Sequence, residues 1–493
     1  MLFRTIGCGR GRNRATVLSV VCVLLLGAPA WSYVTVLNNG PSSNRVDIVF
    51  LGDGYTVADH AAGTYADHVN GYLGYMFSNT LTTDPFYRYR NYFNVHRIDV
   101  VSNESGADKP PQHIYADTAL DASYWWDGGP QRLLYVNAPK TDAIKSADLA
   151  GAGFTADMQY VTVNDTMYGG GGGDYAVYAG ANSSAHRVAM HEMGHSYADL
   201  ADEYDYGSDG PYTGPEPVRV NITTNATGQK WARWLGHNQS GIGVIGAYEG
   251  AGHYETGLYR PSENSKMRSS SQPFDAIGRE KVILTIYDRV NPLDSWLDNT
   301  AWLVNPGDIH VQPIDDEIIE VEWYVDDSLV PLANSDTFNL LDYGYGEGTY
   351  TVSARAYDPA GFDPVNGWVR TKQWKLEQTV AWDVAVTMPE LHEPGDANDD
   401  GVVDDLDLTA LAAHWEQWGS WRDGDFNGDG RISDLDLTIL AMAWPAGFGV
   451  PTGSGGNVSA VPEPALLSLL APGVAALVCR KRNRRDSRQV VEK

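Results

Sequence analysis

The sequence predicts a multidomain chain with three folded units: an α/β unit, a β-sandwich and a small α-helical unit. Three observations support this prediction. Short apolar runs alternate with helical patterns over the first 300 residues, and closely spaced strands dominate from about residue 302. An Asp-, Asn- and Gly-rich segment then occurs twice between residues 396 and 446. With 493 residues, 43% of them hydrophobic, the chain is long enough to bury several cores.

The N-terminal unit is expected to cover residues 34–295. Residues 46–51 form a buried-strand pattern that ends in Gly52-Asp53-Gly54-Tyr55, a turn into a predicted helix over 57–78. Such alternation of strands and helices is typical of an α/β (α+β) fold. Further strands are predicted over 93–101, 131–137 and 160–163, and a further helix from cap candidates at 182–184 to about residue 200.

The middle unit, residues 300–388, has the pattern of a β-sandwich of Ig-like type. Its strand candidates are short, are separated by turns such as Asp326-Asp327, and show no helical periodicity. No residue in it suggests chemistry. The predicted strands cover 318–325, 348–357 and 368–376.

A zinc-hydrolase motif lies in the predicted helix before residue 200. In His191-Glu192-Met193-Gly194-His195 the two histidines are four residues apart, so both side chains lie on one face and can bind one ion. Zinc suits two neutral imidazoles plus a carboxylate and leaves a position open for water. Glu192 beside that face is the candidate general base that deprotonates the zinc-activated water.

The third zinc ligand is expected just past the end of this helix. Asp202 is the first candidate, because a carboxylate there can fold back onto the metal. Glu203 is the second candidate, and His237 and His253 are remote ones. A Met in the segment Ser265-Lys266-Met267-Arg268 is a candidate supporting turn beneath the metal.

These segments resemble the IgA-peptidase metallopeptidase family, a metzincin-like group. The resemblance rests on Gly52-Asp53-Gly54-Tyr55-Thr56, on a Gly-rich stretch before the helix, on HEMGHSYADLADEY and on the Met267 segment. It implies zinc, endopeptidase activity and Glu192 as the catalyst, but not IgA as the substrate. The metzincin pattern has Gly three residues and the ligand six residues after the second His, where this sequence has Ala198 and Ala201.

The repeat in residues 394–446 has the spacing of EF-hand-type calcium loops. Such loops place oxygen ligands at positions 1, 3, 5, 7 (a backbone carbonyl), 9 and 12, with Gly at position 6. Two Ca²⁺ sites are therefore predicted, and Asp at position 12 with a helix after each loop resembles a type I dockerin, which implies a cohesin-type partner. The predicted ligands are Asp396, Asn398, Asp400, Val402, Asp404 and Asp407 in the first loop, and Asp425, Asn427, Asp429, Arg431, Ser433 and Asp436 in the second.

Both ends of the chain have the pattern of targeting signals. Residues 1–30 combine four Arg, a short apolar run and Ala28-Pro29-Ala30, as in a cleaved signal peptide; a membrane anchor is the alternative. After a Gly/Ser/Pro linker over 447–460, residues 461–493 combine Val-Pro-Glu-Pro, an apolar run and a basic cluster. This tail resembles the PEP-CTERM sorting signal, which a sorting transpeptidase processes; a plain anchor is the alternative.

The sequence thus predicts an exported zinc-dependent endopeptidase that acts on protein or peptide substrates. We expect it at the cell surface, in the outer membrane or outside a Gram-negative cell. The formal net charge of −28 opposes binding to phosphate backbones, so nucleic acid is excluded as a partner. The alternative is a calcium-dependent surface binding or scaffold protein with an inactive peptidase-like domain.

Overall fold

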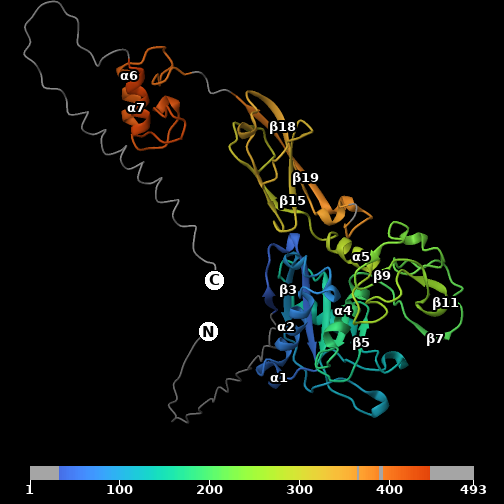
Figure 1. Cartoon of the computed structure of the whole chain (residues 1–493). Coiled ribbons are helices and arrows are strands. Elements are labelled where there is room, and N and C mark those ends of the chain that lie inside the picture. Colours follow the sequence, from blue (N-terminus) through green and yellow to red (C-terminus); the bar gives the residue numbers. More distant parts are fainter. Residues whose placement is uncertain (1–32, 364–365, 388–391, 445–493) are drawn as a thin grey trace, which may run out of the picture. The chain divides into compact units, whose positions relative to one another are not determined.

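A computed structural model describes residues 33–363, 366–387 and 392–444 (Figure 1). The described residues form two compact units, which are divided after Thr387. The architecture is mixed α/β with several sheets and few helices. The predicted signal peptide, the 447–460 linker and the predicted sorting segment lie outside the described residues.

A six-stranded sheet forms the centre of the first unit, in the order β1-β3-β2-β4-β6-β5. The four inner strands are parallel, and the two edge strands, β1 and β5, are antiparallel to their neighbours. Parallel strands need crossover connections, which explains the alternation of strands and helices in the sequence. The strands are β1 (Val34–Leu37), β2 (Val46–Asp53), β3 (Phe93–Ile98), β4 (Met158–Val163), β5 (Gly170–Gly172) and β6 (Ala176–Ala179).

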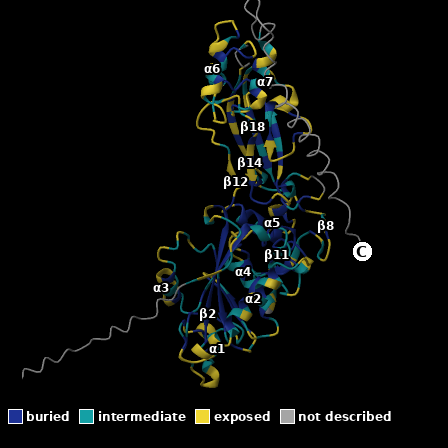
Figure 2. Cartoon of the chain, turned by 90° about the vertical axis from the view of Figure 1, so that its left-hand side faces the viewer, coloured by how far each residue is buried: buried dark blue, intermediate teal, exposed yellow. Residues whose placement is uncertain are grey.

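Both faces of this sheet are covered, so its central strand is buried on both sides. All eight residues of β2 are buried, and Figure 2 shows the dark blue strands beneath the helices. Side chains alternate between the faces: Ile48 and Phe50 belong to one hydrophobic core, and Val49 and Leu51 to the other. The first core also includes residues of α2 (Thr64–Met76) and α4 (Ala185–Ser196).

The helix expected over 57–78 is two helices. α1 (Val57–Ala61) begins at a capping box in which the Thr56 side chain accepts from the Asp59 backbone and the Asp59 side chain accepts from the Thr56 backbone. Gly63 then adopts φ 81° at the start of α2, a left-handed conformation that interrupts a continuous helix. The strand expected over 131–137 is also absent as a named strand, and only isolated bridges form there, such as Leu133 with Gly170. α3 (Ala138–Asp148) follows this segment.

After α4 the chain forms two small sheets and then helix α5. A three-stranded sheet has the order β10-β11-β7, and a two-stranded hairpin joins β8 to β9. Since β11 and β7 are parallel with His253 opposite Asp205, the start of β11 lies beside the segment that follows α4. The elements are β7 (Asp205–Asp209), β8 (Asn238–Gln239), β9 (Gly243–Val244), β10 (Tyr248–Ala251), β11 (His253–Arg260) and α5 (Ala276–Ile286).

Two further sheets complete the first unit and face each other. The rings of Trp323 and Phe338 stack with centroids 5.2 Å apart, and those of Trp323 and Trp382 with centroids 5.7 Å apart, so the inner faces share one core. The three-stranded sheet has the order β12-β14-β17 and the five-stranded sheet β13-β19-β18-β15-β16. Their strands are β12 (Leu293–Trp296), β13 (Leu303–Val304), β14 (Ile309–Pro313), β15 (Glu320–Val325), β16 (Ser328–Leu329), β17 (Thr337–Phe338), β18 (Gly348–Tyr357) and β19 (Glu377–Val386).

The prediction of a strand over 368–376 is wrong, because that segment packs on helix α5 instead of joining a sheet. The backbone N–H groups of Arg370 and Thr371 both donate to Oε1 of buried Glu280 on α5, each at 2.6 Å. Asp358 makes a second connection: it is fully buried and accepts from Arg88 and Tyr89 at 2.6 Å each. The sandwich is therefore joined to the central sheet region by buried polar contacts.

The second unit is small and helical. Each calcium-loop segment leads into a helix, α6 (Asp405–Ala413) or α7 (Asp434–Ala443), and each helix begins at a capping box. Its core consists of six buried residues, namely Ala397, Val403, Leu411, Phe426, Ile432 and Leu440. So small a core provides little stability by itself.

Candidate active site

Helix α4 places His191 and His195 one turn apart on one face. Their Nε2 atoms lie 3.3 Å apart, and their rings are nearly perpendicular, with centroids separated by 4.9 Å. The Nδ1 atom of His191 lies 2.9 Å from the Lys266 carbonyl, and that of His195 lies 2.7 Å from the Leu200 carbonyl. Because a carbonyl only accepts, each Nδ1 carries a proton, and each Nε2 is the ring nitrogen that faces the shared point.

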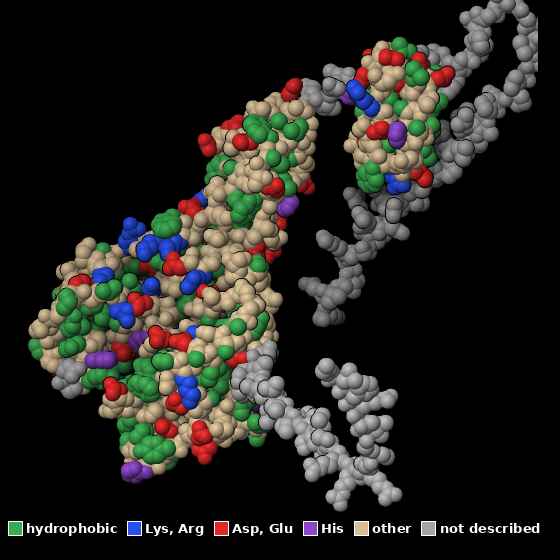
Figure 3. All heavy atoms as spheres, turned by 180° about the vertical axis from the view of Figure 1, so that it is seen from behind, with side chains coloured by type: hydrophobic (Ala, Val, Ile, Leu, Met, Phe, Trp, Pro, Cys, Tyr) green, Lys and Arg blue, Asp and Glu red, His purple; other side chains and the backbone are tan. Residues whose placement is uncertain are grey.

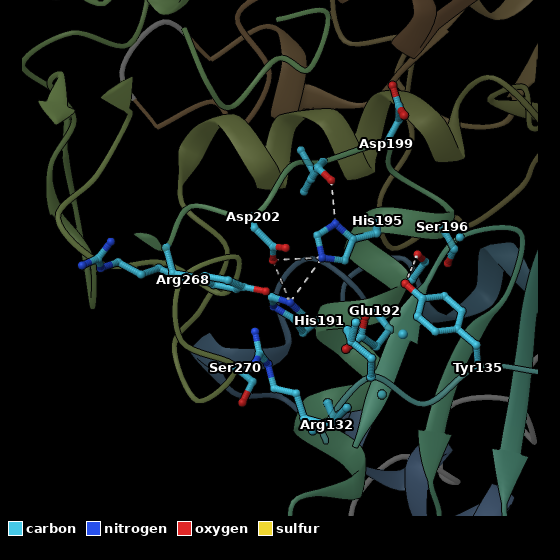
Figure 4. A pocket seen from close by; sticks show the side chains of 18 of the residues that line it. Arg132, Tyr135, His191, Glu192, His195, Ser196, Asp199, Asp202, Arg268 and Ser270 are labelled. Atoms are coloured by element: carbon cyan, nitrogen blue, oxygen red, sulfur yellow. Dashed lines mark hydrogen bonds and ion pairs between the residues drawn. The ribbon is translucent and has the colours of Figure 1, made fainter. Parts of the chain in front are cut away.

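Asp202 completes the group from the segment after the helix. The chain turns at Asp199, whose φ of 54° is left-handed, and Leu200 N–H donates back to the Gly194 carbonyl at 2.9 Å. This turn brings Oδ1 of Asp202 to 3.2 Å from Nε2 of His191 and 3.1 Å from Nε2 of His195 (Figure 4). Among the described residues this is the single group of three or more His, Cys, Asp or Glu ligand atoms that all lie within 4.8 Å of one another.

The other candidates for the third ligand lie elsewhere or play a different part. Glu203 is buried on the far side of the segment, where it accepts from Asn221 at 2.9 Å and from Ser265 at 2.6 Å. His237 packs against Trp234. His253 does not reach the histidine pair, but its Nε2 lies 3.0 Å from Oδ2 of Asp202.

The charges of this group are strongly coupled. Burial alone would raise the pKa of Asp202, but the three histidines that face the carboxylate hold its pKa far below the usual range. Burial likewise opposes the charged form of His195, yet the Asp202 carboxylate raises the pKa of His195 to about 9. Oδ1 of Asp202 is buried and receives no well-formed hydrogen bond from the described residues. Two imidazole nitrogens and a carboxylate oxygen thus converge on one point, which fits a zinc-type donor set.

Glu192 lines a cavity of about 530 Å³ next to this group. Burial raises the pKa of Glu192, and the positive charge of the histidines opposes part of that rise. Arg132, Tyr135 and Tyr168 line the same cavity as Glu192. A buried carboxylate with a raised pKa suits proton transfer.

The glycine run allows strand β5 to pack directly against α4. A Cβ at Gly170 would lie 2.7 Å from Oε1 of Glu192 and 2.4 Å from a methyl group of Val188. A Cβ at Gly172 would lie 2.5 Å from Cβ of His195. Real Cβ atoms do not approach other atoms so closely, so these positions require glycine for packing rather than for backbone flexibility.

Met267 lies directly beneath the helix turn that joins the two histidines. Ser265 and Arg268 close a tight turn through a 3.0 Å backbone hydrogen bond, and Met267 is 1% exposed. A Cβ on Gly194 would lie 2.5 Å from Sδ of Met267. The carbonyl of Met267 also accepts from Glu203 N–H at 2.9 Å, so the turn supports both the helix and the Asp202 segment.

The first calcium-loop segment curls around its predicted ligands. Gly401 has φ 80°, and its N–H donates to Oδ2 of Asp396 at 2.7 Å. Asp407 is fully buried; its Oδ1 accepts from Ala397 N–H at 2.8 Å and its Oδ2 from Asp404 N–H at 2.8 Å. Asn398, Asp400 and the Val402 carbonyl belong to the same loop, and the side chain of Val402 is exposed.

The second loop repeats this arrangement. Gly430, with φ 82°, donates to Oδ2 of Asp425 at 2.8 Å, and Ser433 N–H donates to Oδ2 of fully buried Asp436 at 2.8 Å. Both loops therefore have the backbone shape of a ligand loop, with the carboxylates of positions 1 and 12 turned inward. Positions 3, 5 and 7 are Asn427, Asp429 and Arg431.

Comparison with protein families matches both functional segments. Residues 34–242 match the model described as IgA Peptidase M64, and residues 394–443 match the model of the dockerin type I domain. Over residues 34–242 the chain is therefore similar to the M64 peptidases. The family resemblance expected from the sequence is confirmed, including the dockerin, and the dockerin indicates an extracellular or cell-surface protein.

The other comparisons add little to these matches. No curated protein matches this chain. A solved structure of the Bacteroides ovatus mixed-linkage glucan utilization locus SGBP-B in complex with mixed-linkage heptasaccharide aligns with 14% identity and a TM-score of 0.14. The alignment covers 21% of this chain and 28% of that chain, and a likeness this low carries no argument. In the described part of the chain, no helix is both long and apolar enough to cross a membrane.

Two residues of the candidate active site were not predicted from the sequence. Arg132 comes from the segment before α3, and Tyr204 follows Asp202 and stacks on His253 with ring centroids 5.2 Å apart. Arg132 lies 59 residues before His191, and no motif surrounds it. Only the position of Tyr204 next to the predicted ligands offered a signal.

Proposed function

We propose that the M64 domain is a zinc-dependent endopeptidase of metzincin-like type, in which His191, His195 and Asp202 hold the metal. The proposal rests mainly on one observation. The Nε2 atoms of the two histidines and Oδ1 of Asp202 converge on a single point, while backbone carbonyls bind the Nδ1 atoms and hold both rings in place. The donor set leaves room for water, because the cavity opens on that side. Zinc bound there supplies a Lewis acid.

In this proposal Glu192 is the general base. It takes a proton from the attacking water and later gives it to the leaving amine nitrogen, so that the peptide bond is exchanged for a carboxylate and an amine. Its raised pKa, caused by burial, favours return of the proton in the second step. Gly170 leaves room for the Glu192 carboxylate, and Met267 packs against the helix turn between the two histidines.

The experiment compares the full chain with Glu192→Gln on a denatured protein mixture, with and without chelator. We expect chelator-sensitive cleavage that zinc restores, and a loss of about 10³-fold or more in Glu192→Gln with one zinc still bound per chain. Cleavage that persists in chelator, or zinc that is lost together with Glu192, would contradict the proposal. Intact ligands and base disfavour the alternative of an inactive scaffold.

For the second unit we propose two calcium sites of EF-hand type and a cohesin-type partner. The support is the shared backbone shape of the two loops and the dockerin match. The predicted export signal and the PEP-CTERM-like tail place the protein, in this proposal, at the surface of a Gram-negative cell or outside it. Mass spectrometry of the mature termini tests both processing sites.

A further inference from the structure

A second groove of the first unit is lined by positive charge. It has a volume of about 350 Å³ and is lined by three segments: the chain before β8, helix α5, and the segment before β19. Figure 3 shows Lys and Arg side chains gathered on one face of the first unit, where the sandwich meets the rest. The charged residues are Lys230, Arg233, Lys281, Lys372 and Lys375, against Glu280 and Asp288. We call this site the basic groove.

The acidic residues of the basic groove do not neutralise it. Glu280 is 6% exposed, and its two oxygens are occupied by Trp234, by the backbone of the 370–371 segment and by the Thr371 hydroxyl. Asp288 pairs with Lys375. Lys230 pairs with Glu216 outside the groove. Both acidic side chains of the groove thus already have hydrogen-bond or ion-pair partners within the protein.

Two ammonium groups remain without a partner. Among the described residues, no hydrogen bond or ion pair is made by the side chain of Lys281 or Lys372. Both residues line the groove. Burial lowers the pKa of Lys281, and the positive charges of Lys372 and Arg219 lower it further. Lys372 also adopts φ 48°, a strained conformation for Lys, at the start of its short helix.

The basic groove lies next to the cavity of the candidate active site along the chain, because two consecutive residues line one each. Arg219 lines the peptidase cavity and pairs there with Asp199, whereas the next residue, Val220, lines the basic groove. A polypeptide bound in the cavity can therefore extend past Arg219 into the groove. The whole chain is strongly acidic, with a formal net charge of −28, so an anionic segment is repelled by most of the protein and attracted by this groove.

We propose that the basic groove is an exosite that binds an acidic segment of the polypeptide substrate. The inference rests on the proposed peptidase function and adds a substrate class, namely proteins with a run of Asp and Glu near the cleaved bond. Carboxylates provide the acceptors that Lys281 and Lys372 lack. The groove lies beside a peptidase cavity, which favours a polypeptide over an acidic polysaccharide.

The first test uses fluorogenic peptides that share one cleavable core and carry Glu₆ or Gln₆ at either end, behind a Gly-Ser spacer. We expect the Glu₆ peptide to have a KM about tenfold lower at low salt, with the advantage lost at high salt. The double variant Lys281→Gln/Lys372→Gln should remove the advantage. The matched control Lys140→Gln/Arg90→Gln, which removes two surface charges elsewhere, should retain it.

The second test separates the exosite from the peptidase function. Fluorescence anisotropy of a labelled Glu₆ peptide with the Glu192→Gln protein reports binding without cleavage, and we expect it to weaken about tenfold in the same double variant. If no peptide is cleaved but anisotropy shows the effect, the peptidase proposal fails, whereas binding of an acidic polypeptide in the basic groove stands. Equal binding of Glu₆ and Gln₆ peptides, or an effect that survives in the double variant, would overturn the exosite. Binding of a sulfated polysaccharide without binding of the Glu₆ peptide would also overturn it.

Discussion

Nε2 of His253 lies 3.0 Å from Oδ2 of Asp202, and Oδ1 of the same carboxylate faces the histidine pair. His253 adopts φ 76°, and its ring stacks on Tyr204. The parallel register of β11 with β7 holds His253 in this strained conformation. We therefore predict that His253 orients Asp202 through this contact without being a metal ligand itself.

Replacement of His253 by Phe should lower zinc affinity about 10- to 100-fold, because Phe retains the ring stacking but loses the hydrogen bond to Asp202. Competition with a chromophoric chelator measures this affinity. His237→Phe is the control, since His237 packs against Trp234 away from the site, and it should leave the affinity unchanged. An unchanged affinity in His253→Phe would remove His253 from any positioning role.

Asp202→Asn should reduce zinc occupancy strongly, whereas Glu203→Gln should retain one zinc per chain. The reason is geometric: Asp202 faces the histidine pair, and Glu203 is turned away into hydrogen bonds with Asn221 and Ser265. Metal analysis after dialysis measures both variants, and circular dichroism checks their folding. Similar occupancy in both would place the third ligand elsewhere.

Glu203→Gln should also change how stability depends on pH. Burial, with the nearby charge of Asp275, raises the pKa of Glu203 well above its usual value, so the folded state favours the protonated form. The contribution of Glu203 to stability is therefore present below its unfolded pKa and is lost as pH rises. Relative to the natural chain, the Tm of Glu203→Gln should therefore increase progressively as the pH rises above the unfolded carboxyl pKa.

Glu216→Gln is the control of opposite sign for this experiment. Although burial opposes it, contacts with Lys230 and Thr224 lower the pKa of Glu216 to about 2. Its contribution is present above the unfolded carboxyl pKa and is lost as pH falls towards 2. The Tm deficit of Glu216→Gln should thus shrink on acidification. A pH-independent difference for Glu203→Gln would show that Glu203 is charged in the fold.

Gly170→Ala should lower the rate of cleavage by about two orders of magnitude while leaving zinc bound, because the new methyl group would displace the carboxylate of Glu192. Gly173→Ala is the matched control in the same run, since its Cβ would meet only the ring of Tyr135, at an ordinary 3.8 Å. Steady-state kinetics and metal analysis distinguish the two. Full activity in Gly170→Ala would mean that strand β5 shifts freely.

Calcium should stabilise the second unit of the full chain. Each loop brings several carboxylates close together, and these carboxylates repel one another. The six buried core residues of the unit provide too little stability to offset this repulsion, so a bound cation should stabilise the fold. Calorimetry should show two calcium ions per chain, and one ion in Asp396→Ala or in Asp425→Ala. Asp405→Ala, at a helix start outside the ligand positions, should still bind two. Binding of no calcium would leave the repeat as an acidic segment.

The patterns that could be predicted from the sequence are local ones. The helical spacing of His191 and His195 depends only on backbone periodicity, and the shape of each calcium loop depends on one glycine and its neighbours. By contrast, the strand expected over 368–376 failed because buried Glu280, distant in sequence, binds that segment. Apolar and β-branched content alone does not reveal such a partner.

The sequence was sufficient for the M64 and dockerin resemblances and for the two-histidine helix, since each rests on residues close together along the chain. The choice of Asp202 over Glu203 required the left-handed turn at Asp199 and the packing of Met267 beneath it. Arg132, His253 and the basic groove required contacts between segments 50 to 150 residues apart. Such contacts depend on how sheets and helices pack, because side chains separated in sequence meet only when the core that joins them has formed.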